Sequence, residues 1–203
     1  MGGAVDYLAA ILRSCAIIAR METRRALVLV TLAVLAGSGG QGDAEGMRWE
    51  SAGMRGAFSA SSFNDSFLLT EMCADLDLPT HAPWRFESSS GWLLQTRLDL
   101  SAGWLSGHGE DGFIASAGPL FAIGNKKFPL FLDLGLSPTF LSRYRFNRTD
   151  FGVPIQFTSH AGLLWDVGSH VTVGYRLQHM SNAHINAANP GLDLHSFGIS
   201  YRF

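Results

Sequence analysis

The final stretch of the chain decides its fold: residues 175–203 read YRLQHMSNAHINAANPGLDLHSFGISYRF. It holds two segments in which apolar residues alternate with polar or small ones, and a loop rich in Asn and Ala joins them. A period of two sends successive side chains to opposite faces, as in a β-strand. The stretch therefore predicts an antiparallel hairpin with one apolar and one polar face. In the last segment the mainly apolar face carries Asp193, His195, Phe197, Ile199, Tyr201 and Phe203, and Ser196, Gly198, Ser200 and Arg202 share the other.

Similar segments recur through the chain from Met54 onward, separated by clusters of Gly, Pro, Asn and Asp. Segments of about ten alternating residues suit a tilted membrane strand of about 9–11 residues. We therefore predict an all-β fold, an eight-stranded antiparallel outer-membrane β-barrel in a domain of residues 45–203. A secreted soluble sandwich or lipocalin-like barrel is the competing all-β interpretation. The eight expected strands are Met54–Ser62, Phe67–Leu78, Trp92–Ser106, Phe113–Gly124, Leu130–Ser142, Ile155–Val167, His170–Asn182 and Asp193–Phe203.

The composition agrees with a β protein that has much apolar surface. Charged residues make up 16% of the chain, against roughly 25% in a typical soluble domain. There are 23 glycines and 11% aromatic residues, and no apolar run after the N-terminal region is long enough for a transmembrane helix. The net charge of −2 gives no broad basic field, so nucleic acid is not an expected partner. Cys73 is the one thiol beyond the N-terminal region, which excludes an internal disulfide framework.

The N-terminal region has the pattern of a secretory signal. Two arginines follow Met21, the apolar run Ala26–Ala36 comes next, and Ser38 completes a small-x-small cleavage pattern. We predict that residues 1–44 form the signal region, with the true start at Met21 and cleavage between residues 38 and 44. The aromatic Phe203 at the end of the chain resembles the sorting signal of bacterial outer-membrane barrels. The expected location is therefore the outer membrane.

An even number of strands places both ends of a barrel chain on the periplasmic side, so the odd-numbered connections lie outside. Arg143–Pro154 and His184–Leu192 are then outer loops, and Asp166–Ser169 is a periplasmic turn. The connection Pro79–Gly91 is long for a periplasmic turn, which counts against this assignment of the strands.

Three polar residues lie on otherwise apolar faces of the last two expected strands. His179 and Ser181 continue a face that is apolar up to Leu177, and Asp193 shares the apolar face of the last strand. Polar groups that face lipid cost free energy, so a function is the default hypothesis for them. A His can take the proton of a Ser hydroxyl, and a carboxylate can orient the His. The pattern indicates a hydrolase site; the alternative is that all three lie in the headgroup zone, where polar groups cost little.

The motif HMSNA at residues 179–183, followed by NPGLD at 189–193, resembles the PagL-type lipid A 3-O-deacylases of Gram-negative outer membranes. The resemblance implies an eight-stranded barrel that removes the acyl chain esterified at the 3 position of lipid A. By position, it implies that His179 is the base, Ser181 the nucleophile and Asp193 the acid, where the family has Glu. Asn182 matches the residue implicated in the oxyanion hole, and Gly191 matches a loop glycine. Lipid A of lipopolysaccharide is then the expected partner, no cofactor is implied, and a homodimer is left open.

Other residues near this motif admit ordinary explanations. His184 and His195 flank it, but no Cys or Glu completes a ligand set, so no metal site is expected. Three arginines of the outer loop, Arg143, Arg145 and Arg148, either contact lipid A phosphates or are simply solvated. Acyl chains have an expected apolar wall in Val173, Tyr175, Leu177 and Phe197. The alternative functions are a non-enzymatic small barrel with a structural or adhesion role, and a secreted lipid carrier.

Overall fold

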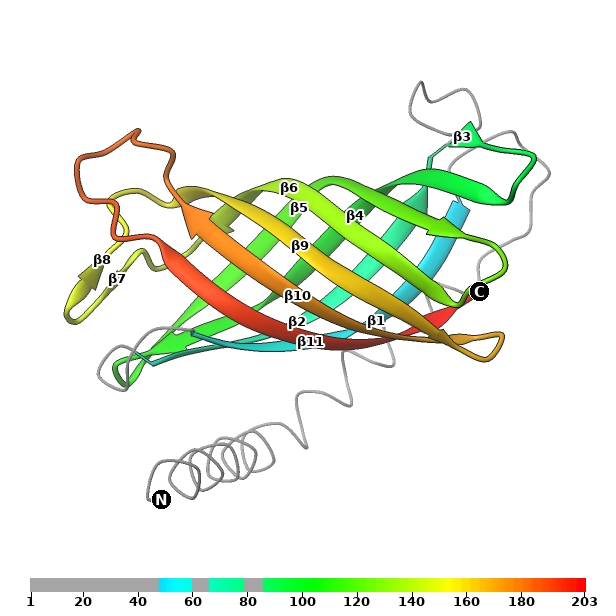
Figure 1. The fold of residues 1–203 in the computed structure, drawn as a ribbon. Coiled ribbons are helices and arrows are strands. Elements are labelled where there is room, and N and C mark those ends of the chain that lie inside the picture. Colours follow the sequence, from blue (N-terminus) through cyan, green and yellow to red (C-terminus); the bar gives the residue numbers. More distant parts are fainter. Residues whose placement is uncertain (1–47, 60–65, 79–85) are drawn as a thin grey trace, which may run out of the picture. The chain divides into compact units, whose positions relative to one another are not determined.

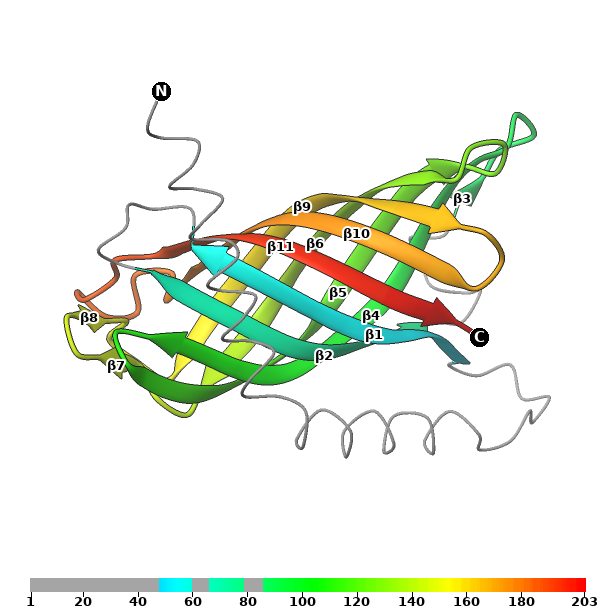
Figure 2. The ribbon, with the colours of Figure 1, turned by 90° about the horizontal axis from the view of Figure 1, so that it is seen from below.

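The computed structural model describes residues 48–59, 66–78 and 86–203, so the signal region predicted for residues 1–44 lies outside it. In the described residues eight long strands form a closed antiparallel barrel, as predicted (Figures 1 and 2). The pairing runs around the ring in the order β2, β1, β11, β10, β9, β6, β5 and β4, and β4 pairs with β2 to close it. The long strands are β1 (Arg48–Ser59), β2 (Phe67–Asp77), β4 (Trp92–Gly107), β5 (Glu110–Asn125), β6 (Leu130–Leu141), β9 (Ile155–Val167), β10 (Val171–Ser181) and β11 (Leu192–Arg202).

The first strand departs most from its predicted bounds. It begins at Arg48 rather than at Met54. The register of β1 against β2 shifts between Trp49 and Ser51. Such an irregularity breaks the alternation of side chains, so a period-two pattern cannot follow the strand through it. The other long strands begin and end close to their predicted bounds.

The connections predicted to lie outside share one end of the barrel, hereafter the loop end. The hairpin of β7 (Arg145–Phe146) and β8 (Thr149–Asp150) lies there, as does the connection between β10 and β11 (Figure 1). The β9–β10 turn and Phe203 lie at the opposite end (Figure 1). There β3 (Phe86–Glu87) folds back onto β4, which accounts for part of the long connection at residues 79–91.

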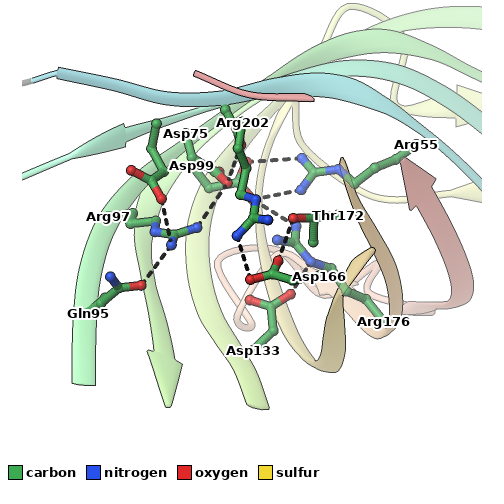
Figure 3. Close-up of polar contacts among 12 residues, drawn as sticks. Arg55, Asp75, Gln95, Arg97, Asp99, Asp133, Asp166, Thr172, Arg176 and Arg202 are labelled. Carbon is green, nitrogen blue, oxygen red and sulfur yellow. Dashed lines mark hydrogen bonds and ion pairs between the residues drawn. The ribbon is translucent and has the colours of Figure 1, made fainter. Parts of the chain in front are cut away.

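Inward-facing side chains form a network of buried ion pairs (Figure 3). Arg55 donates to Glu71 at 2.7 Å and to Asp99 at 2.8 Å. Arg176 donates to the same Asp99 carboxylate at 2.8 Å and also to Asp133. Each buried carboxylate therefore faces a guanidinium, which offsets the cost of removing these charges from water. The network ties strands together across the lumen, because its members come from β1, β2, β4, β6 and β10.

Toward the loop end the interior is apolar instead. Phe146 and Phe151, from the connection between β6 and β9, are buried and pack against each other and against Phe67. Met180 and Leu192 belong to the same cluster and pair with each other at the ends of β10 and β11. The cluster thus supports from inside the strand ends that carry the predicted site. Its other members are Ala57, Leu69, Leu105, Ile114, Leu141 and Leu194.

The outer wall carries large apolar side chains that remain exposed, as contact with lipid requires. Leu177 and Phe197 are exposed, whereas Arg176 and Ser196 are buried, so the predicted faces of the last two strands are confirmed. No helix in the described part of the chain is long and apolar enough to cross a membrane. Further exposed members of the wall include Phe113, Leu132, Leu136, Leu163, Trp165, Val173, Ile199 and Tyr201.

Candidate active site

The structure brings His179 and Asp193 together on the outer wall. The two residues pair directly across β10 and β11, one residue before the end of the ladder at Met180 and Leu192. Nδ1 of His179 and Oδ1 of Asp193 lie 2.7 Å apart in a hydrogen bond. Their side chains are 53% and 69% exposed, so the pair is open to whatever lies outside the barrel. An imidazole held in this way by a carboxylate is suited to act as a base.

Two serines lie beside this pair on the same outer face. Ser181 is the last residue of β10 and is half-buried, two positions beyond His179. Ser159, on the neighbouring strand β9, pairs directly with His179. Within the described residues neither hydroxyl has a hydrogen-bond partner. His179 is therefore flanked by Asp193 on one side and by a serine on the other, with Ser181 next along its own strand.

Gly191 lies against the imidazole of His179. Its φ of 69° is in the left-handed region that favours glycine, and a Cβ there would lie 3.2 Å from Cε1 of His179. Glycine thus lets the loop return to β11 close to the ring. The glycine that the sequence motif includes, Gly191, therefore allows the close approach of the loop to His179.

Asn182 lies on the opposite face from Ser181 and is fully buried. Its side-chain amide donates to the carbonyl of Phe151 at 3.0 Å and to that of Ala188 at 2.7 Å. Its backbone N–H donates to Oδ1 of Asn189 at 3.0 Å. All its N–H donors are therefore engaged, and Asn182 fastens the β10–β11 connection to the apolar cluster inside the barrel.

A tight turn follows Ser181 at once. The backbone N–H of Ile185 donates to the carbonyl of Asn182 at 3.0 Å, and Ala183 and His184 between them have φ values of 51° and 64°. Two central residues with positive φ make a type I′ turn, which Gly, Asn and Asp dominate. The backbone N–H groups of Ala183 and His184 have no partner among the described residues. Sequence reasoning missed this turn, because an Ala-His pair carries no signal for it.

The outer-loop arginines are largely paired within the protein. Arg143 donates to Glu110 at 2.9 Å, and Arg145 forms an ion pair with Asp150, with Nε and Oδ2 2.9 Å apart. Arg148 is exposed on the turn between β7 and β8. Among the described residues no group of three or more His, Cys, Asp or Glu side chains is placed to hold a metal ion.

Comparisons with known proteins agree with this architecture. A model of the lipid A 3-O-deacylase (PagL) family matches residues 73–202, which includes every residue of the candidate site. The lipid A deacylase PagL of Bordetella bronchiseptica is 30% identical over 138 residues, covering 63% of this chain and 74% of that protein. The crystal structure of the outer membrane enzyme PagL superposes with a TM-score of 0.61 at 18% identity, covering 74% of this chain and 97% of that chain. The chain therefore belongs to the lipid A 3-O-deacylase (PagL) family of outer-membrane β-barrel enzymes.

Proposed function

We propose that this protein hydrolyses the acyl ester at the 3 position of lipid A by a Ser-His-acid mechanism on the outer wall of its barrel. The observation that carries the proposal is the 2.7 Å hydrogen bond between His179 and Asp193, which lies on the lipid-facing side beside Ser181. A substrate that is itself a membrane lipid reaches an outward-facing site without leaving the bilayer. The family assignment supports the same substrate class.

Asp193 fixes the tautomer of the base. When Nδ1–H of His179 donates to Asp193, Nε2 carries no hydrogen and can accept the proton of the Ser181 hydroxyl. The serine oxygen then attacks the ester carbonyl, and His179 returns the proton to the sugar oxygen that leaves. Water, deprotonated by His179, then attacks the carbonyl of the ester formed on Ser181, and His179 returns this proton to the Ser181 oxygen as the fatty acid leaves. We expect the contact between Ser181 and His179 to close when substrate binds, as catalytic hydrogen bonds commonly tighten in complexes.

The oxyanion of the tetrahedral intermediate needs donors beside Ser181. The motif offers Asn182 for this role, and its amide hydrogens already bind backbone carbonyls. We propose that Asn182 serves the oxyanion hole by fixing the turn that follows it. The N–H groups of Ala183 and His184 in that turn are then the donors, two and three residues after the nucleophile. The backbone strain of their positive φ is of the kind that functional sites retain.

The acyl part of the substrate has a continuous surface to lie on. Val173, Leu177 and Phe197 are exposed on the outer face between the site and the opposite end of the barrel, and Tyr175 lies between them. Burying methylene groups on such a surface provides binding energy remote from the ester. The sugar and phosphates of lipid A would then lie at the loop end, near the exposed Arg148.

The decisive experiment compares two serines on the same wall. Lipid A from cells that produce the wild type, Ser181→Ala or Ser159→Ala protein is analysed by mass spectrometry. We expect the wild type to remove one 3-hydroxyacyl mass, the Ser181→Ala variant to leave lipid A intact, and the Ser159→Ala variant to act like the wild type. Losing a nucleophile commonly costs several orders of magnitude in rate. If Ser181→Ala kept full activity and Ser159→Ala lost it, the nucleophile would be Ser159 on β9. If lipid A were unchanged in cells that produce the wild type, the proposed reaction would be refuted.

A further inference from the structure

A cluster of four aromatic rings lies on the outer wall next to the His179–Asp193 pair. Its members are Phe58 on β1, Tyr175 on β10, and His195 and Phe197 on β11, three strands that lie side by side (Figure 2). The ring centroids of Phe58 and His195 are 5.5 Å apart, those of Tyr175 and Phe197 5.0 Å, and those of Phe58 and Phe197 6.3 Å. These contacts across strands hold the rings of the four-ring cluster in place.

The four-ring cluster contains one polar contact. The Tyr175 hydroxyl and Nδ1 of His195 lie 2.8 Å apart in a hydrogen bond, and the His195 ring is stacked between Phe58 and Tyr175. Polar groups on a lipid-facing wall are costly unless they are paired. Here Tyr175 and Nδ1 satisfy each other. If the hydroxyl donates to Nδ1, Nε2 of His195 carries a hydrogen and is a donor without a partner in the described part of the chain.

The depth of His195 in the membrane limits which ligand groups can reach its Nε2–H. His195 pairs with Leu177, which precedes Ser181 by four positions on β10, and this corresponds to about 13 Å along the strand. With a strand tilt of about 45°, His195 lies roughly 9 Å deeper in the membrane than the nucleophile. A plain acyl chain has no oxygen at this depth below its ester. Only a chain that bears a hydroxyl or an acyloxy ester on a carbon at this depth offers an acceptor to His195.

We propose that His195, held by Tyr175, hydrogen-bonds an oxygen carried on an acyl chain next to the one cleaved. This inference rests on the proposed esterase site. The pair then acts as a specificity determinant, because a donor in an apolar site favours a ligand that satisfies it over one that leaves it unpaired. Substituted acyl chains would be preferred to plain ones. Two sources supply the same acceptor chemistry, a free hydroxyl and an acyloxy ester, and the test separates them.

The test uses detergent-folded, full-length barrels and three synthetic lipids that share the cleavable ester. The neighbouring acyl chain is unsubstituted, hydroxylated or acyloxylated, and the released fatty acid gives kcat/KM for each. We expect wild-type protein to prefer at least one substituted lipid by about tenfold, the usual worth of one hydrogen bond in an apolar site. His195→Phe keeps the ring stacking and removes both nitrogens, so its kcat/KM should be equal for the three lipids. Tyr175→Phe leaves His195 unfixed and should give an intermediate preference.

Phe197→Leu is the matched control from the same cluster, since it removes a ring and no hydrogen bond. It should change kcat/KM for all three lipids by the same factor. Binding of the lipids to Ser181→Ala protein repeats the comparison without turnover, and there too His195→Phe should abolish the preference. Preference that persists in His195→Phe, or its absence in wild type, would overturn the inference. A binding preference without fatty acid release would instead refute the proposed esterase and leave the role of His195 standing. Retained heat-modifiable gel mobility shows that each variant is folded.

Discussion

Among the residues that the structure describes, two His–Asp pairs have opposite surroundings. His160 and Asp133 face the lumen, with Nε2 and Oδ1 3.3 Å apart and side chains 4% and 0% exposed. His179 and Asp193 face outward, with Nδ1 and Oδ1 2.7 Å apart and side chains more than half exposed. The same two residue types thus make an enclosed polar contact in one place and an accessible one in the other.

The difference lies in what surrounds each imidazole. His160 stands over Gly135, where a Cβ would lie 2.3 Å from its ring, and its partner Asp133 also accepts from Arg176. That pair is almost wholly buried and joins the network through Asp133. His179 instead has Ser181 beside it and open surface around it. A His–carboxylate contact is therefore not sufficient for catalysis, which also needs a nucleophile and an approach for substrate.

Removing each imidazole in turn should give the largest difference in deacylation rate between the two pairs. We expect His179→Ala to lower the deacylation rate by about four orders of magnitude or more, because the serine loses its base. His160→Ala should leave the rate within a few fold at equal folded protein. Release of fatty acid from purified lipopolysaccharide, normalised to the folded band on a gel, measures both. Comparable losses in the two variants would mean that the lumen pair takes part in catalysis or that the outer pair does not.

The two carboxylates should show the reverse order in stability. Asp133→Ala leaves the buried Arg176 and His160 without this partner, and losing one member of a buried ion pair typically costs about 3–5 kcal/mol. Asp193→Ala removes an exposed carboxylate and should change the free energy of unfolding little, while it lowers the rate substantially, though less than His179→Ala does. Urea unfolding, followed by gel mobility, measures the free energy of unfolding of both variants. Equal unfolding midpoints for the two variants would contradict the contrast between the pairs.

Alternation predicted much of this architecture from sequence because one face of each long strand meets the apolar exterior. Parity alone placed His179, Ser181 and Asp193 on the outer wall. Parity cannot say which residues meet across the lumen, so the pairing of Asp99 with Arg55 and Arg176 was not predictable. Such contacts depend on how the ring closes.

For the candidate site, the sequence predicted that His179, Ser181 and Asp193 share the outer face, but not the contacts between them. That Asp193 lies directly opposite His179 depends on the register that the β10–β11 connection imposes. Ser159 was missed because its strand is distant in sequence, and only the pairing of β9 with β10 brings it beside His179. The hydrogen bond between Tyr175 and His195 had a partial signal, since both residues share the outward face of adjacent strands.

The smallest expected effect concerns Asp193, where the resemblance to the family implies a Glu. Asp193 reaches His179 because the two residues are directly opposite, where Cβ atoms lie about 4.5–5.5 Å apart and a short arm suffices. Asp193→Glu adds one methylene to a side chain that is 69% exposed, so no packed neighbour resists it. The longer arm can bend to keep the hydrogen bond to Nδ1, at the cost of ordering one more rotatable bond.

We therefore expect Asp193→Glu to keep the wild-type rate within about threefold, since one side-chain torsion is worth roughly half a kcal/mol. Asp193→Asn is the matched control: it is nearly isosteric with Asp, yet it lacks the charge that stabilises the imidazolium and can donate to Nδ1, which favours the wrong tautomer. Its rate should fall by at least two orders of magnitude. Fatty acid release from lipopolysaccharide in detergent compares the three proteins. If the Glu variant lost as much activity as the Asn variant, the position of the carboxylate would matter as much as its charge.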